Sequence, residues 1–133
     1  MKILVFLFAL CSLTLVSQNN YSSLDTIKAP ASYDNIYARP LYKDTAEVSS
    51  YVIFIKSEVK MHKHIDHAEH VVVLAGNGEM TLGEKKFLVK KGDVIFIPKN
   101  TFHGVKTTSK TPLKVLSVQA PYFDGKDRVM KEQ

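Results

Sequence analysis

The stretch MHKHIDHAEHVVVLAG, residues 61–76, places two alternating histidines shortly before an apolar run that ends in a glycine. If Lys60 to His64 forms a strand, the side chains of His62 and His64 project from the same face, because strand side chains alternate with a period of two. A short loop then leads to Glu69, which opens the next predicted strand. The sequence therefore predicts that two imidazoles and one carboxylate converge on a single point.

Short strands are predicted on both sides of this stretch. Ser50 to Lys56 is rich in β-branched and aromatic residues, and it is predicted as a strong strand with apolar side chains on both faces. Asn35 to Leu41 is a weaker strand that Pro40 confines to a sheet edge, because proline cannot donate a ladder hydrogen bond. Asn77-Gly78 predicts a two-residue hairpin turn with positive φ angles. Further strands are expected over residues 69–75, 79–82, 85–89, 94–97, 102–107 and 113–120.

These segments amount to about eight or nine short strands, and no window shows a convincing helical period. Such a series is typical of an all-β jelly roll or small barrel, an arrangement that limits exposed sheet edges. An immunoglobulin-like sandwich is the alternative, but the cysteine and tryptophan landmarks of antibody domains are absent from the sequence. The residues expected to line the barrel or lie in its core are Val71, Val73, Phe96, Phe102 and Val105.

The first residues have the features of a secretory signal peptide. Lys2 precedes a 14-residue apolar run, Ile3 to Val16, which polar residues follow. The run is short for a membrane span, which needs about 20 apolar residues, so no stable membrane insertion is expected after cleavage. The sequence therefore predicts a signal peptide at residues 1–17 and an exported protein, periplasmic or secreted. The single cysteine, Cys11, lies within this run.

Composition divides the remaining chain into three parts. Residues 18–33 lack a hydrophobic period and are expected to form a flexible leader. Residues 34–126 are predicted to form one β-barrel domain, because a chain of 133 residues suffices for one modest core. Tyr122 and Phe123 are expected to pack back on the barrel, and residues 127–133 are expected to form a loose tail.

The chain is basic, with 18 lysines and arginines against 13 acidic residues and a net charge of +5. The basic residues are scattered over turns and strand faces. A nucleic-acid site would instead gather them on one element, together with aromatic residues for stacking. The sequence therefore predicts no nucleic-acid partner, and it leaves a mild preference for anionic small molecules.

A third imidazole is available from His103, which follows a turn and begins a strand of its own. Together, these residues and the neighbouring glycines resemble the two conserved motifs of the cupin superfamily. The first motif has two histidines separated by one residue, then a glutamate, then a glycine after six further residues. The second has a glycine, five residues, a proline and a histidine. The matching positions are His62, His64, Glu69 and Gly76 for the first motif, and Gly92, Pro98 and His103 for the second.

Three positions depart from the family pattern, and none of them is a ligand. Lys56 and Asn100 stand where glycines are expected, and Thr107 stands where an asparagine is expected. Asn100 is a mild change, since asparagine tolerates a left-handed turn better than other non-glycine residues. The resemblance covers residues 50–120, and the ending that follows is similar to that of small single-domain bacterial cupins.

The resemblance implies a double-stranded β-helix barrel in which His62, His64, Glu69 and His103 bind one divalent transition metal. Imidazole and carboxylate ligands suit Fe, Mn, Zn, Ni or Cu. A metal-free barrel whose histidines form hydrogen bonds is the alternative. A tetrahedral ion with four protein ligands would be structural, whereas an octahedral ion keeps two positions open for chemistry. Small cupins are often homodimers, so the resemblance also implies that this protein forms a homodimer.

Two classes of function follow from this resemblance. The leading hypothesis is an exported metal-dependent enzyme, such as an isomerase, lyase or dioxygenase, acting on a small oxygen-rich molecule such as a sugar acid, keto acid or diol. The alternative is a non-catalytic module that captures a small ligand or a metal. No catalytic residue is assigned beyond the ligands. His70 is expected to point away from the face that carries Glu69. Asp66 and His67 are expected in an exposed loop, and the alternative is that one of them is a proton shuttle or supports a metal ligand.

Overall fold

The computed structural model describes residues 21–42 and 47–132, so the predicted signal peptide lies outside the described residues. The regular structure of the described chain consists of the short 3₁₀ helix η1 (Leu24–Thr26) and ten strands. No helix in these ranges has the length and apolar character needed to cross a membrane. The strands are β1 Ile36–Tyr42, β2 Ser49–Ile55, β3 Glu58–Lys63, β4 Ala68–Ala75, β5 Asn77–Leu82, β6 Lys85–Lys90, β7 Val94–Ile97, β8 His103–Thr107, β9 Leu113–Ala120 and β10 Val129–Met130.

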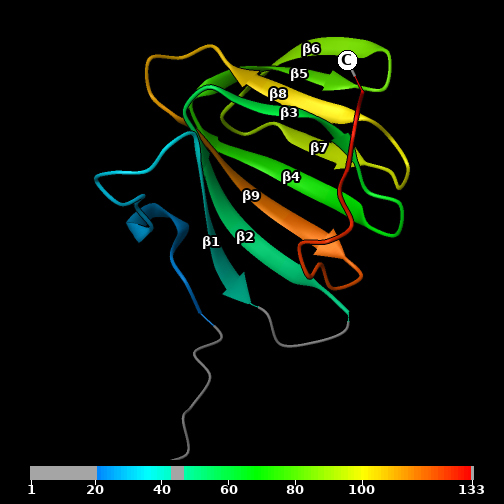
Figure 1. Cartoon of the computed structure of the whole chain (residues 1–133). Helices are drawn as coiled ribbons and strands as arrows, with labels where there is room; N and C mark the ends of the chain where they lie inside the picture. The colour runs from blue at the N-terminus through cyan, green and yellow to red at the C-terminus, as the bar shows by residue number, and fades with distance from the viewer. Residues whose placement is uncertain (1–20, 43–46, 133) are drawn as a thin grey trace, which may run out of the picture.

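The strands form two five-stranded antiparallel sheets that lie face to face (Figure 1). The first sheet has the order β1-β2-β9-β4-β7, and the second has the order β10-β3-β8-β5-β6. Neighbouring strands come from distant parts of the sequence, since β4 pairs with β9 and β3 pairs with β8. This interleaving is that of a jelly roll, so the all-β prediction is confirmed. The strand that contains Pro40 lies at a sheet edge, as expected.

The main hydrophobic core fills the space between the two sheets. Val73 is 1% exposed within it, and Val71 packs against it, as the alternation along β4 predicts. The prediction for Phe96 was wrong, because its side chain is 56% exposed. Ile95 and Ile97 occupy the inner face of β7 instead, and the residue between them must therefore point outward.

The chain after β4 does not form the predicted hairpin. Strands β4 and β5 belong to different sheets, so residues 76–78 carry the chain from one sheet to the other. Of these three residues, only Gly76 has a positive φ, at 78°. Gly78 is needed for close packing, because a Cβ atom there would lie 2.9 Å from Val105 Cγ2 and 3.0 Å from the Lys106 carbonyl oxygen. The hairpin prediction was therefore wrong, since a local Asn-Gly signal does not specify which sheet the next strand joins.

A second hydrophobic cluster involves the segment before β1. Val52 and Phe54 of β2 pack against Ile27, whose side chain is 3% exposed. Lys114 Nζ donates hydrogen bonds to the carbonyl oxygens of Leu24, at 2.6 Å, and Ile27, at 3.0 Å. The described part of the predicted flexible leader is therefore packed against the first sheet. This packing also explains why β2 is apolar on both faces.

Ile27→Ala should lower the free energy of unfolding by about 2 kcal/mol or more, because truncating a buried aliphatic side chain loses its burial and leaves a cavity. Chemical denaturation followed by circular dichroism measures the change. Leu88→Ala is the matched control, since Leu88 is 75% exposed on β6. Its truncation should change the free energy by less than about 0.5 kcal/mol. Equal stability of Ile27→Ala and the wild type would show that this segment does not stabilise the domain.

Candidate metal centre

Three histidines come together at one end of the space between the sheets. His62 lies near the end of β3, His64 follows that strand directly, and His103 opens β8. His62 and His103 are opposite each other in the register of β3 and β8. One ring nitrogen of each histidine lies within 4.8 Å of the other two, and the ring centroids are 4.3 to 5.4 Å apart. The structure thus brings together the three imidazoles that the sequence predicted.

Main-chain carbonyl groups orient all three rings. Each Nδ1 atom contacts a carbonyl oxygen, which can only accept a hydrogen bond, so the neutral rings carry their proton on Nδ1. Each Nε2 atom then keeps a free lone pair, and those of His64 and His103 are buried without a hydrogen-bond partner. The carbonyl acceptors are those of Lys60 for His62 at 2.8 Å, Thr101 for His103 at 2.9 Å, and Asp127 for His64.

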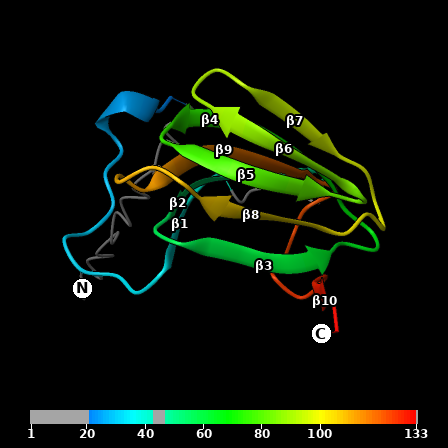
Figure 2. The ribbon, with the colours of Figure 1, turned by 90° about the horizontal axis from the view of Figure 1, so that it is seen from above.

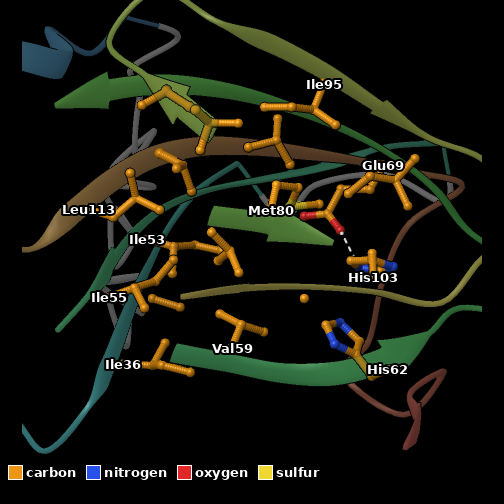
Figure 3. Close-up of a pocket in the computed structure, with 18 of the residues that line it drawn as sticks. Ile36, Ile53, Ile55, Val59, His62, Glu69, Met80, Ile95, His103 and Leu113 are labelled. Carbon is orange, nitrogen blue, oxygen red and sulfur yellow. Dashed lines mark ion pairs between the residues drawn. The ribbon is translucent and has the colours of Figure 1, made fainter. Parts of the chain in front are cut away.

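Glu69 approaches the histidines from β4, on the opposite sheet (Figure 3). Its Oε2 atom lies 3.4 Å from His103 Nε2 and 3.7 Å from His64 Nε2. Its Oε1 atom accepts a hydrogen bond from the hydroxyl of Ser117, which is fully buried on β9. Ser117 therefore fixes the carboxylate with one oxygen directed at the imidazoles.

Burial and neighbouring groups determine the charges of these residues. Burial lowers the pKa of His62 to about 4, and the nearby His103 imidazole adds to the effect. Burial also lowers the pKa of His64. Burial alone would raise the pKa of Glu69, but the His103 imidazole, when it is protonated, and the Ser117 hydroxyl outweigh it and lower that pKa to about 2. At neutral pH the rings of His62 and His64 are therefore neutral, and the Glu69 carboxylate is ionised.

This arrangement favours a bound cation. The lone pairs of two neutral imidazoles face a carboxylate oxygen, and a positive charge between them would relieve their mutual repulsion. Neutral imidazole nitrogens and carboxylate oxygens are also ligands that divalent transition metals prefer. His62, His64 and His103 form a group that can hold a metal ion, and Glu69 fits as a fourth ligand by position and charge.

The C-terminal segment holds the loop between β3 and β4. The Asp127 carboxylate accepts hydrogen bonds from the backbone N–H groups of Ile65 and Asp66, each at 2.8 Å. It also accepts from His67 Nδ1 at 2.5 Å, and His67 Nε2 lies 2.9 Å from the carbonyl oxygen of Tyr122. Because Asp127 also orients His64 through its main chain, one residue connects the tail to the metal centre.

These contacts correct two expectations. His67 is 8% exposed, so it does not lie in an exposed loop. Residues 127–133 were expected to be loose, but Asp127 is hydrogen-bonded, and β10 pairs with β3 beside His62 (Figure 2). The sequence offered no local signal, because Asp127 and His67 are 60 residues apart. His70, in contrast, is exposed and contacts Phe96 on the outer face, as expected for a residue next to Glu69.

Asp127→Asn should destabilise the metal-free protein more in mild acid than in base. Desolvation opposes the ionisation of Asp127, but hydrogen bonds from His67 and two backbone amides outweigh it and lower its pKa. Desolvation likewise opposes the charge on His67, but Asp127 and the Tyr122 carbonyl raise the pKa of His67 above 6.5. The contribution of Asp127 to the free energy of unfolding is therefore fully present above its ordinary pKa of 3.8. The contribution of His67 is lost as the pH rises through its raised pKa.

Denaturation of both proteins at about pH 5.5 and about pH 9 measures this difference. The free energy of unfolding should differ more between the wild type and Asp127→Asn at the lower pH. A difference that is larger at the higher pH would contradict the ion pair.

A cavity of about 190 Å³ adjoins the candidate metal centre, and its lining includes the exposed residues Ile36 and Arg128 (Figure 3). Fourteen of the twenty residues that line it carry apolar side chains. Figure 3 shows Ile36, Ile55 and Leu113 at the end of the cavity away from His62 and Glu69. The centre therefore opens onto a largely aliphatic space. The polar side chains in the lining are those of His62, Glu69, His103, Gln119 and Arg128.

Sequence reasoning missed Ser117, Gln119 and Arg128. Ser117 and Gln119 share the inner face of β9 with Leu113 and Val115, and all four are buried. Polar residues at inward positions of a predicted strand were therefore an available signal. Arg128 has no such local signal, because β10, which follows it, is placed only through its pairing with β3.

The jelly roll, with three histidines and a glutamate facing its interior, places this chain among the small β-barrel proteins with a candidate metal site. The chain belongs to the cupin domain family, whose pattern matches residues 52–119. The resemblance stated from the motifs is confirmed at this level. The double-stranded β-helix architecture is likewise shown.

Three comparisons describe the similarity to known proteins. The chain is 41% identical over 90 residues to an uncharacterized protein of Aquifex aeolicus, covering 67% of this chain and 73% of that protein. It is 36% identical over 76 residues to the mannose-1-phosphate guanylyltransferase RfbM of Salmonella typhimurium, covering 57% of this chain but 15% of that enzyme. A solved double-stranded β-helix protein from Klebsiella pneumoniae matches with a TM-score of 0.74 and 21% identity, covering 87% of this chain and 100% of that one. This last likeness supports the fold alone.

Proposed function

We propose that this cupin binds one divalent transition metal ion through His62, His64, Glu69 and His103, and that the loaded centre acts on a small molecule held in the adjacent cavity. The observation that carries the proposal is the set of buried Nε2 lone pairs facing an ionised carboxylate. Membership of the cupin family and the three-histidine group support the same site. Fe, Mn, Zn, Ni and Cu all suit these ligands.

A bound divalent ion would supply Lewis-acid polarisation of a ligand oxygen. The chain's own part is to hold the ligands in place. The carbonyl acceptors orient the three rings, and the Ser117 hydroxyl positions the Glu69 carboxylate. The aliphatic lining of the cavity places few polar groups around the site, which strengthens electrostatic interactions there.

Protein purified without chelator should contain close to one equivalent of metal per chain, measured by elemental analysis. His64→Ala and Glu69→Ala should each lose most of it, because each removes one ligand and leaves nothing in its place. His70→Ala is the matched control, since His70 adjoins Glu69 in sequence but is exposed on the outer face. The control should keep the metal content of the wild type.

Retention of metal in both ligand variants would contradict the proposal. Wild-type protein that takes up none of the five ions on dialysis would contradict it as well. Glu69→Gln keeps the shape of the side chain and removes its charge. Loss of metal in this variant, with an unchanged melting temperature of the metal-free form, separates lost coordination from unfolding.

A non-catalytic binding module is the second candidate, and one observation favours it. Apart from the candidate ligands, the polar side chains in the cavity lining are Gln119 and Arg128. Neither is a general acid or base at neutral pH, so an isomerase, lyase or dioxygenase here would depend on the ion and its ligands. Metal-dependent ligand binding without conversion, followed by NMR, favours the module. Product formation that stops when the metal is removed favours the enzyme.

Export is a further proposal, and it is supported by the composition of residues 1–17 alone. After expression with its full N-terminus in a bacterial host, the mature protein should begin near Gln18 and appear in the periplasm or medium. Mass spectrometry of the fractions measures this, and an uncleaved protein retained in the cytoplasm would contradict it. The homodimer expected from the sequence stays a prediction, which mass measurement in solution tests.

A further inference from the structure

The cavity beside the metal centre has two chemically different ends. Strands β4 and β9 are antiparallel, so Glu69 at the start of β4 lies opposite Gln119 near the end of β9. This is the polar end, which His103 also lines. Ile55 and Leu113 pair where β2 ends and β9 begins, and they line the other end. Figure 3 shows this separation along the cavity.

Gln119 presents a polar atom that has no partner in the described protein. Its side chain is 4% exposed, and its Oε1 atom is buried without a hydrogen bond. A buried acceptor that stays unpaired is unfavourable, so this position calls for a donor inside the cavity. A hydroxyl group on a bound molecule satisfies that need.

Arg128 adds a positive charge at the same end. It lines the cavity, and it forms no ion pair with any carboxylate of the described residues. It lies close to the metal centre, since Met130, two residues further along the chain, pairs with His62. A guanidinium group binds carboxylates in a bidentate fashion, so an anionic head group fits this position.

The aliphatic end disfavours sugar-like molecules. A polyol carries a hydroxyl group on most of its carbons, and each one placed among isoleucine and valine side chains loses its hydrogen bonds. Apolar cavities of about 150 Å³ bind molecules the size of benzene. A cavity of about 190 Å³ therefore accommodates an aliphatic body of about six carbon atoms.

Building on the proposed metal-dependent function, we propose that the cavity selects a small aliphatic 2-hydroxy acid. The carboxylate of the ligand faces Arg128, and its hydroxyl group donates to Gln119 Oε1. Its hydrocarbon body lies among the apolar side chains. The hydroxyl and the carboxylate are adjacent in this class of molecule, and Gln119 and Arg128 both line the polar end of the cavity. Among the oxygen-rich substrates expected from the sequence, this proposal favours an aliphatic hydroxy acid and excludes sugar acids.

The test compares 2-hydroxy-4-methylpentanoate with gluconate. Both carry the same 2-hydroxycarboxylate head, so the contacts of the head group with Arg128 and Gln119 are matched, and the two acids differ in their bodies. Calorimetry on the metal-loaded full chain should show at least about tenfold tighter binding of the aliphatic acid. Equal or tighter binding of gluconate overturns the proposal, and so does the absence of binding by either acid.

The role of Gln119 is tested with 4-methylpentanoate, which lacks the hydroxyl group. The preference of the protein for the hydroxy acid over this analogue should fall about tenfold in Gln119→Leu. The metal contributes equally to that preference in the wild type and in Gln119→Leu, so the change reports on Gln119. An unchanged preference overturns the role of Gln119.

Arg128→Met should weaken the binding of 2-hydroxy-4-methylpentanoate and of 4-methylpentanoate about tenfold each, because both carry the carboxylate. Arg39→Met is the matched control, because Arg39 is an exposed arginine on β1 next to Ala38, whose side chain lines the cavity. If Gln119→Leu does not fold, Val115→Thr tests the aliphatic lining with a side chain of similar shape. The added hydroxyl group should weaken binding of 2-hydroxy-4-methylpentanoate, and unchanged binding overturns the proposal.

Elemental analysis of the wild type separates this proposal from the metal centre. Metal-loaded protein without a preference for the aliphatic acid overturns the ligand class and leaves the metal centre intact. Protein that binds no metal overturns the proposed function. In that case the two acids are titrated into the metal-free protein, where preference for the aliphatic acid supports the ligand class and its absence overturns it.

Discussion

An ionised carboxylate inside an apolar barrel is unfavourable unless nearby groups compensate its charge, and Glu69 is where this protein meets that constraint. The Ser117 hydroxyl compensates one oxygen, while the other is directed toward the Nε2 atoms of His64 and His103. Those atoms are lone-pair acceptors, so they do not supply the missing positive charge. A cation between the carboxylate and the imidazoles would supply that charge.

The local parts of this arrangement could be predicted from the sequence. Period-two alternation was enough to place His62 and His64 together, and the turn before β8 brought His103 beside them. Asn100 has a φ of 58°, the left-handed conformation that its side chain tolerates where the family pattern has glycine. These predictions succeeded because each depends on a few neighbouring residues and on the regular geometry of a strand.

The predictions that failed depend on contacts between distant parts of the chain. The Asn-Gly pair at residues 77–78 has the composition of a hairpin, but the sheet that β5 joins determines the path of the chain. Nothing near Asp127 indicates that its carboxylate holds a loop 60 residues earlier. Ile27 likewise gives no sign of its partner on β2, because a single apolar residue in a polar segment has no period. Both Ile27 and Asp127 lie outside residues 52–119, the range that the family pattern matches. The flanking segments therefore help to complete both the core and the site.

The carbonyl acceptors of the three imidazoles have a consequence for how this site can change. Every residue type has a backbone carbonyl group, so no replacement of the side chain at position 60, 101 or 127 removes the acceptor itself. An insertion or deletion near these positions would move the carbonyl away from its ring and release the imidazole to rotate. The ligand geometry is thus encoded in the length and path of the chain. It tolerates changes of side chain at positions 60 and 101, whereas Asp127 is also constrained by the hydrogen bonds of its carboxylate, and a shift of one residue would disrupt all three contacts.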